Sequence, residues 1–348
     1  MRITIQFTIV PLLAVLLSGG MLRASEQSTE PDKFFREYVG LADDQIQSIR
    51  HGKALARVLD SRTPDEVFVF GAVYIDASPE SYLKLAADID ALRKLPNFLA
   101  IQRFSEPPQL SDLDGFTLEE EDVKQLKNCK PGHCEIQLPA ESMEEFQREV
   151  DWSASDVAGQ VNRSAQRMAL EALVRYQQQG NAALGTYRDK NHPAEVAATF
   201  QFLLSRSKAL PVYLPDLDRY LLDYPGAKSR SIDSEFYWEK VNFGLKPTLR
   251  IVQAIVYRGT NSNEPAYAVA VKQLYSSHYF QTALDLTVCV KDPARPRGFY
   301  LITLKGSKQA GLTGLKGGIV RKVAVGKTRS SLERTLVSIK EKLETQTN

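Results

Sequence analysis

Residues 272–280 carry the densest cluster of polar and aromatic side chains in the sequence, Lys-Gln-Leu-Tyr-Ser-Ser-His-Tyr-Phe. Alternate side chains of a strand share a face, so Lys272 and His278 would point the same way, and Tyr275 belongs to the same cluster. If the face of His278 lines a cavity, its imidazole could donate a hydrogen bond to a ligand or act as a general base. The alternative is a structural histidine with satisfied hydrogen bonds near a strand turn.

Three further positions could contribute to such a site. Arg250 is a charged residue inside an apolar run, so it either lies on a solvated face or anchors an anionic head group. Asp285 also lies in an apolar run and could pair with Arg250 or with His278. Trp238 stands among large side chains that either line a pocket or cover a helix contact. The predicted ligand-binding residues are therefore Trp238, Arg250, Lys272, Tyr275, His278 and Asp285.

Motifs for known catalytic chemistry are missing from the sequence. It has four histidines, no His-Glu-x-x-His pair for zinc and no Gly-x-Ser-x-Gly elbow for a nucleophilic serine. Residues 326–328, Gly-Lys-Thr, match the end of a phosphate-binding loop, but Arg321 stands where the first glycine is required. We therefore predict no catalytic residue, no cofactor and no metal. An enzyme that uses His278, Arg250 or Asp285 stays open as an alternative.

Two of the three cysteines are close in the sequence. Pro131-Gly132 favours a turn that brings Cys129 and Cys134 together. In an oxidising compartment this spacing predicts a disulfide that closes a small loop. Zinc bound by the two cysteines and His133 is an alternative that lacks a fourth ligand, and free thiols are another. Cys289 has the surroundings of a buried strand thiol.

The first 24 residues have the pattern of a secretory signal peptide. Arg2 precedes an apolar run from Ile3 to Leu17, and Leu22-Arg23-Ala24 ends on a small residue at the cleavage point. A membrane anchor is the alternative, but the run is shorter than the roughly 20 residues that span a bilayer. We expect removal of residues 1–24 and a soluble chain that is periplasmic or secreted, with no stable membrane insertion after cleavage.

The balance of charges gives no reason to expect a nucleic-acid partner. The 348 residues contain 44 Lys and Arg and 42 Asp and Glu, and 43% of them are hydrophobic. Residues 1–24 hold Arg2 and Arg23 and no acid, so the charges of the remaining chain cancel. A neutral chain has no general attraction to DNA, RNA or anionic lipid surfaces. The ordinary composition also excludes intrinsic disorder and a many-span membrane protein.

Strands dominate both ends of the chain, and helices occupy its middle. Runs of β-branched and aromatic residues predict strands at 66–75, 98–104, 236–243, 248–258, 266–275, 278–291 and 298–305. Helical spacing of apolar residues predicts helices within 33–60, over 79–95, over 157–179, from Pro193, from Pro215 and over 317–343. Ser153 and Asp156 resemble a capping box ahead of the helix at 157–179.

This order of elements resembles the START and polyketide-cyclase-like (SRPBCC, helix-grip) superfamily. Residues 74–80, Tyr-Ile-Asp-Ala-Ser-Pro-Glu, followed by Leu-Pro-Asn-Phe at 95–98, look like the family's first strand and helix pair. Residues 317–321, Gly-Gly-Ile-Val-Arg, look like its closing segment. The resemblance implies an α+β fold, in which a curved antiparallel sheet of about seven strands grips a long C-terminal helix.

The resemblance also implies a domain organisation and a function. Residues 66–105 and 234–345 would form the helix-grip domain, after an N-terminal helical extension at 25–65. Residues 106–233 would be a mainly helical insertion that carries the disulfide loop. Proteins of this fold hold a hydrophobic small molecule or lipid between sheet and helix, so we expect the chain to bind or carry one. The alternatives are an enzyme acting on an apolar substrate in the same cavity and a protein that docks a partner through the insertion.

Overall fold

The computed structural model of the chain describes residues 31–94, 97–243, 246–261, 264–292, 295–311 and 314–345. The predicted signal peptide, the Leu-Pro pair at 95–96 and parts of the predicted turns at 261–263 and 292–293 lie outside these ranges.

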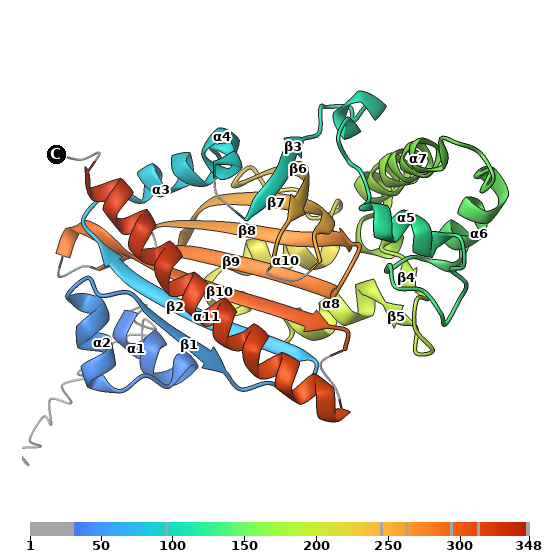
Figure 1. The fold of residues 1–348 in the computed structure, drawn as a ribbon. Coiled ribbons are helices and arrows are strands. Elements are labelled where there is room, and N and C mark those ends of the chain that lie inside the picture. The colour runs from blue at the N-terminus through green and yellow to red at the C-terminus, as the bar shows by residue number, and fades with distance from the viewer. Residues whose placement is uncertain are drawn as a thin grey trace, which may run out of the picture.

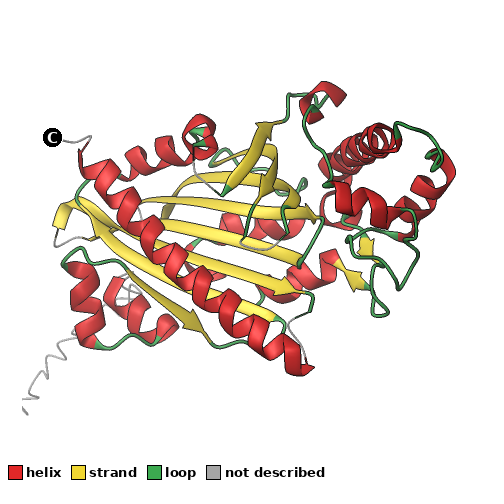
Figure 2. Cartoon of the chain, viewed as in Figure 1, coloured by secondary structure: helices red, strands yellow, loops and turns green. Residues whose placement is uncertain are grey.

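The fold is α+β and is built on one large antiparallel sheet of eight strands (Figures 1 and 2). The strand order is β1-β2-β10-β9-β8-β7-β6-β3, so β1 and β3 are the edges and the sheet is not closed. The strands are β1 (Leu55–Leu59), β2 (Glu66–Ile75), β3 (Phe98–Arg103), β6 (Ile232–Val241), β7 (Thr248–Asn261), β8 (Glu264–Ser276), β9 (Phe280–Asp292) and β10 (Arg295–Gln309). A separate two-stranded sheet pairs β4 (Thr186–Tyr187) with β5 (Ala194–Glu195).

The long helices divide between the middle of the chain and its C-terminus. The helices before the middle are α1 (Pro31–Phe34), the π-helical turn Phe35–Val39, α2 (Asp43–Arg50), α3 (Pro79–Ala86) and α4 (Ile89–Arg93). Between β3 and β6 lie the 3-10 turn Leu110–Leu113, α5 (Glu120–Leu126), α6 (Ala140–Glu149), α7 (Val157–Gln179), the 3-10 turn Gly180–Ala183, α8 (Val196–Leu204), α9 (Leu210–Tyr213) and α10 (Pro215–Asp223). The last helix is α11 (Gly314–Thr345).

Both faces of the sheet are buried, because the strands carry apolar side chains at odd and even positions alike. In β2, Val69, Val73 and Ile75 join a core cluster with Leu332, Leu336 and Leu343 of α11 and Leu83 of α3. The alternate residues Phe70, Ala72 and Tyr74 pack with Phe35, Ile46 and Ile49 from the N-terminal helices. Figure 1 shows α11 running along β2 on one face and α8 and α10 on the other.

The second face continues under the helices between β3 and β6. Ile255, Ala270 and Leu286 of three neighbouring strands form a cluster with residues of α8 and α10, among them Phe200 and Leu217. Helices α5, α6 and α7 stand at one end of the sheet, where β7 begins and β8 ends (Figure 1).

All seven predicted strands are present in the structure, and the large sheet has one strand more than predicted. An eighth strand, β1, lies in the segment predicted as a helical extension, and it pairs with β2 over Leu55–Leu59. This run is short and half-buried at the sheet edge, so its own apolar pattern is weak and the pairing with β2 decides its conformation.

Several predicted boundaries and one predicted cap also differ from the structure. Strand β9 begins at Phe280, so His278 lies in the turn that follows β8, where Tyr279 has a positive φ of 62°. Helix α7 is capped by Asp156, whose side chain accepts a hydrogen bond from the Gly159 amide at 3.1 Å, and no capping bond from Ser153 is present among the described contacts. The next helix, α8, begins at Val196 because residues 194–195 pair as β5.

No helix within the described ranges combines the length and the hydropathy needed to cross a membrane.

The contact between β2 and α11 depends on Gly71. A Cβ atom at Gly71 would lie 2.8 Å from side-chain atoms of both Leu332 and Leu336, which are fully buried. We expect Gly71→Ala to lower the free energy of unfolding by about 1–3 kcal/mol, because overpacking forces α11 away from the sheet. Urea unfolding of the full chain measures this.

Gly326→Ala is the matched control for that substitution. Gly326 lies on α11, and a Cβ atom added there would have no heavy atom within 4 Å. The same added methyl group should there be neutral or stabilise the helix by up to about 1 kcal/mol. Equal losses at the two positions would contradict the packing argument.

Candidate functional site

A pocket of about 340 Å³ lies between α6, α7 and the adjoining ends of β7 and β8. Its volume is within the range of small-molecule binding sites. The apolar residues that line it include Phe116, Leu118, Ile136, Leu138, Phe146, Met168, Leu173, Leu184, Val196, Leu249, Ile251 and Leu274. The lining is therefore drawn from separate stretches of the chain that the fold brings together.

Small side chains on α7 leave this space open. Ala165, Ala169 and Ala172 follow one another by four and three residues, so they share one helix face, and all three line the pocket. Leu173 and Tyr176 continue the same wall toward the sheet. A helix with larger residues at these positions would fill the pocket with its own side chains.

Charged residues mark the rim of the pocket. Glu141, Glu145, Glu171 and Arg175 contribute to its lining. Glu145 is held by Arg167 through an ion pair of 2.8 Å. The pocket is thus apolar inside and polar at its rim, which suits a ligand with a long apolar part.

A β-bulge aims two consecutive residues into the pocket. The register of β7 and β8 shifts where Val252 pairs with Gln273 and Ile251 pairs with Tyr275. Leu274 is the extra residue, and both Leu274 and Tyr275 line the pocket. Strict alternation along the strand, as expected from the sequence, would send them to opposite faces.

The disulfide segment forms another wall of the pocket. Cys129 and Cys134 are bonded, with their Cα atoms 4.7 Å apart, which confirms the predicted pairing and leaves no thiolate for zinc. Ile136 and Leu138, just after the loop, line the pocket. The Gln137 amide donates to the Ser277 carbonyl at 2.8 Å, so the wall is attached to the turn after β8.

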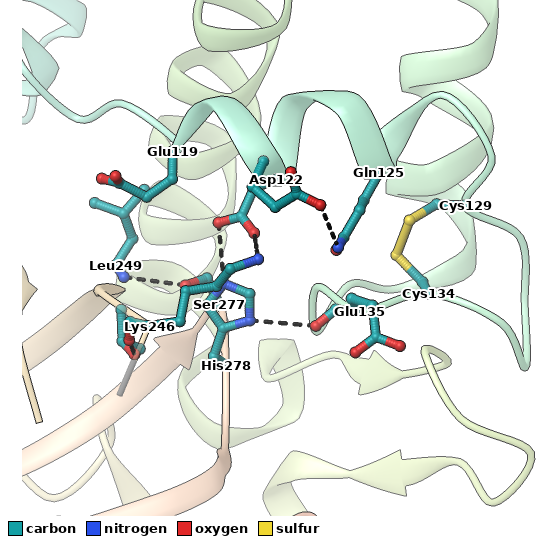
Figure 3. A network of polar contacts seen from close by, with 12 residues as sticks. Glu119, Asp122, Gln125, Cys129, Cys134, Glu135, Lys246, Leu249, Ser277 and His278 are labelled. Atoms are coloured by element: carbon teal, nitrogen blue, oxygen red, sulfur yellow. Dashed lines mark hydrogen bonds and ion pairs between the residues drawn. A yellow bond between two sulfur atoms is a disulfide. The ribbon is translucent and has the colours of Figure 1, made fainter. Parts of the chain in front are cut away.

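His278 reinforces this attachment (Figure 3). Its Nδ1 lies 3.2 Å from the Glu135 carbonyl oxygen, and its Nε2 lies 3.0 Å from Oδ2 of Asp122 on α5. The second carboxylate oxygen of Asp122 accepts a bond of 2.5 Å from Lys246. One buried carboxylate therefore joins α5, the turn after β8 and the segment just before β7.

The hydrogen bonds of His278 are those expected of a structural histidine, one of the two interpretations made from the sequence. Both ring nitrogens lie within hydrogen-bond distance of protein oxygen atoms, the Glu135 carbonyl and the Asp122 carboxylate. The ring is buried and neither nitrogen is free for a substrate. The arrangement is that of the structural histidine, and no nucleophile contacts the ring among the described residues.

Burial and hydrogen bonding act against each other on Asp122. Burial alone would raise its pKa, but the hydrogen bonds and charges of His278 and Lys246 outweigh burial and hold the pKa below its usual range. The carboxylate is therefore ionised at neutral pH, and the neighbouring ammonium group of Lys246 balances its negative charge.

Lys272 is buried behind the pocket with no carboxylate partner in the described part of the chain. Its Nζ donates to the Tyr176 hydroxyl at 3.0 Å and to the side-chain oxygen of Asn181, and it lies 4.2 Å from the centre of the Phe200 ring. Burial lowers the pKa of Lys272 to about 7. Tyr176, which lines the pocket, separates Lys272 from it.

The remaining predicted residues, Trp238, Arg250 and Asp285, do not belong to the lining of this pocket. Trp238 is buried and donates from Nε1 to the Asp112 carbonyl at 2.7 Å. Arg250 is largely buried and pairs with Glu239 at 3.1 Å, while Asp285 pairs with Lys305. Asp285 therefore pairs with Lys305 and not with Arg250 or His278, although the charges of Asp285 and Lys305 also act on Glu239, the partner of Arg250.

Several residues of the site carry no signal in the sequence. Asp122 and Lys246 lie more than a hundred residues from each other, and neither belongs to a motif. The alanines of α7 form a recognisable stripe, but only the packing shows that a hollow faces them. Within the described ranges, no three His, Cys, Asp or Glu side chains gather closely enough to hold a metal ion.

The sequence matches no family model, and no curated protein matches it.

Asp122→Asn tests the buried network. At pH 7 we expect it to lower the free energy of unfolding by about 3 kcal/mol, because His278 and Lys246 lose their shared carboxylate. Asp285→Asn is the control, since Asp285 and Lys305 are each about one-third exposed, and its cost should stay below about 1 kcal/mol. Urea unfolding measures both.

The pH dependence follows from the direction of the Asp122 pKa. A carboxyl with a lowered folded pKa stabilises the fold above its unfolded pKa of about 3.9, and this stabilisation is lost as the pH falls through the folded pKa. The difference between the wild type and Asp122→Asn should therefore shrink below about pH 4. A difference that is constant from pH 7 to pH 3 would contradict the role of Asp122.

Lys272→Met tests the buried ammonium group. Between its folded pKa of about 7 and its unfolded pKa of about 10.4, the unfolded chain binds more protons, so this residue makes stability rise with pH by up to about 1.4 kcal/mol per unit. The variant should lose that slope between pH 7 and pH 9.5, and the exposed Lys84→Met should keep it. Identical slopes in all three proteins would refute this account of Lys272.

Proposed function

We propose that this protein binds an apolar small molecule, or the acyl part of a lipid, in the pocket between α6, α7 and the sheet. The observation that carries the proposal is the mainly apolar lining of a space of about 340 Å³, which exposed charged residues border. Burial of apolar ligand surface contributes roughly 25 cal/mol per Å², so binding requires no catalytic group.

The order of the strands supports the resemblance to the helix-grip fold. The first strand of the expected domain, β2, pairs with the last, β10, and the second, β3, pairs with the third, β6. A long C-terminal helix follows the last strand and packs on β2. In this proposal residues 106–233 are an insertion between β3 and β6, and α11 is the helix that the sheet grips.

The proposed site differs from the one that the resemblance implies. Leu332 and Leu336 of α11 pack directly on β2 at Gly71. The pocket that we assign is on the other face, where the helices of the insertion overhang the sheet end. The insertion would thus supply a ligand site of its own, walled by the disulfide segment.

The disulfide supports an exported protein. A bond between Cys129 and Cys134 persists in oxidising compartments and is rare in the cytosol. We therefore propose that the chain acts in the periplasm or outside the cell, where a carrier can shield an apolar molecule from water.

Filling the pocket tests the proposal. Ala169→Trp places an indole where the small face of α7 borders the pocket. We expect it to weaken binding of the fluorescent probe N-phenyl-1-naphthylamine at least about tenfold, since the probe and the indole compete for one space. Fluorescence titration of the full exported chain measures this.

Ala158→Trp is the matched control for this variant. It places the same side chain on the exposed first turn of α7, outside the pocket, and should leave probe binding unchanged. Melting temperatures of both variants show whether the fold is kept. Equal probe affinity in Ala169→Trp and the wild type, or no saturable binding by the wild type, would refute the proposed site.

A further inference from the structure

A second pocket, of about 430 Å³, lies far from α6 and α7, between the end of α2, the C-terminal end of β2, the start of β10 and the end of α11. We call it the α2–α11 pocket. Unlike the first pocket, it is lined mainly by polar and charged side chains. The charged residues of its lining are Arg50, Arg295, Lys340, Asp76 and Glu344, with His51 beside them.

Most of these charges are already paired. Arg50 pairs with Asp32 at 2.6 Å. Lys340 pairs with Glu344, which also accepts a hydrogen bond of 2.8 Å from the Asp76 amide. Two charged groups are left: in the described part of the chain, Arg295 pairs with no carboxylate and the Asp76 carboxylate pairs with no cation.

Contacts with Tyr74 and Arg50 fix the position of Arg295. Its guanidinium lies 3.6 Å from the centre of the Tyr74 ring, and its Nη1 donates to the Arg50 carbonyl. The Tyr74 hydroxyl donates to the Arg295 carbonyl at 3.2 Å, which fixes the backbone of the same residue. The other N–H groups of this guanidinium have no acceptor in the described structure, and a planar fork held in this way suits a carboxylate.

Asp76 supplies the opposite charge. Its side chain is exposed, while its backbone amide is fixed by Glu344 at the end of α11. Asp76 and Arg295 line one pocket without forming an ion pair with each other. Two charges of opposite sign that line one pocket without an ion-pair partner among the described residues are complementary to a molecule that carries both an ammonium and a carboxylate group.

We propose that the α2–α11 pocket binds a free α-amino acid, with its carboxylate on Arg295 and its ammonium group on Asp76. The pocket volume is within the range of small-molecule sites. A simple anion would use Arg295 and leave Asp76 as a repulsive neighbour, so the pair of residues favours a zwitterion. This site is independent of the apolar pocket and does not rest on the function proposed for it.

The experiment screens the twenty free amino acids one at a time by thermal shift, using the full exported chain, and follows with calorimetric titration of those that bind. We expect at least one to bind saturably. Its N-acetyl derivative, which lacks the ammonium charge, and its methyl ester, which lacks the carboxylate, should each bind at least about tenfold more weakly, because each loses a charge-assisted hydrogen bond.

Variants assign the two contacts. Arg295→Met and Asp76→Asn should each weaken the amino acid at least about tenfold, and Asp76→Asn should leave the N-acetyl derivative unchanged. Arg297→Met and Asp60→Asn, at exposed positions outside the pocket, are the matched controls and should bind as the wild type does. Unchanged melting temperatures without ligand show that the variants fold.

Three results would overturn the proposal. The first is that none of the amino acids binds. The second is that the N-acetyl derivative, or acetate alone, binds as well as the free amino acid, which would reveal a site for anions only. The third is that Arg295→Met binds as the wild type does, which would place the ligand elsewhere.

Discussion

An antiparallel sheet with two apolar faces imposes the main constraint on this protein. Because β2, β9 and β10 bury apolar side chains at both odd and even positions, each face carries apolar surface that a helical cover shields from water. The chain meets this requirement with α11 and α3 on one face and with the N-terminal helices and α8 to α10 on the other. Helices α6 and α7 extend this second cover past the sheet end, and the apolar pocket is the space that they leave there.

Buried polar groups fix how these layers meet. Asp122 balances Lys246 and His278, so α5, the start of β7 and the turn after β8 are held at one point. Lys272 has hydroxyl and amide partners instead of a carboxylate, and burial lowers its pKa accordingly. A buried charge that lost its partners would cost several kcal/mol, so such contacts admit one arrangement of the layers and disfavour others. Ile136 and Leu138 belong to the disulfide segment, which is attached to the turn after β8. This wall of the pocket is therefore held in place by the same contacts.

The two proposed sites differ in the source of their specificity. The pocket beside α7 is shaped by small side chains, since alanines stand where larger residues would fill the space. The α2–α11 pocket is instead marked by two charges without an ion-pair partner in the described chain, one on β10 and one directly after β2. An apolar ligand needs only the first kind of site, and a zwitterion needs only the second, so one sheet can present both without conflict.

The sequence by itself determined seven of the eight strands of the large sheet, the long helices α7 and α11, and the disulfide. The run of β-branched and aromatic residues identified β2 from its first residue to its last, and the turn at Pro131-Gly132 predicted the cysteine pair. These signals are local, because they depend on neighbours within a few residues. Only the tertiary structure decided the partners of Arg250, Asp285 and His278, the pairing of β1 and the bulge at Leu274. Each of these depends on a contact between distant segments, for which the spacing along the chain carries no information.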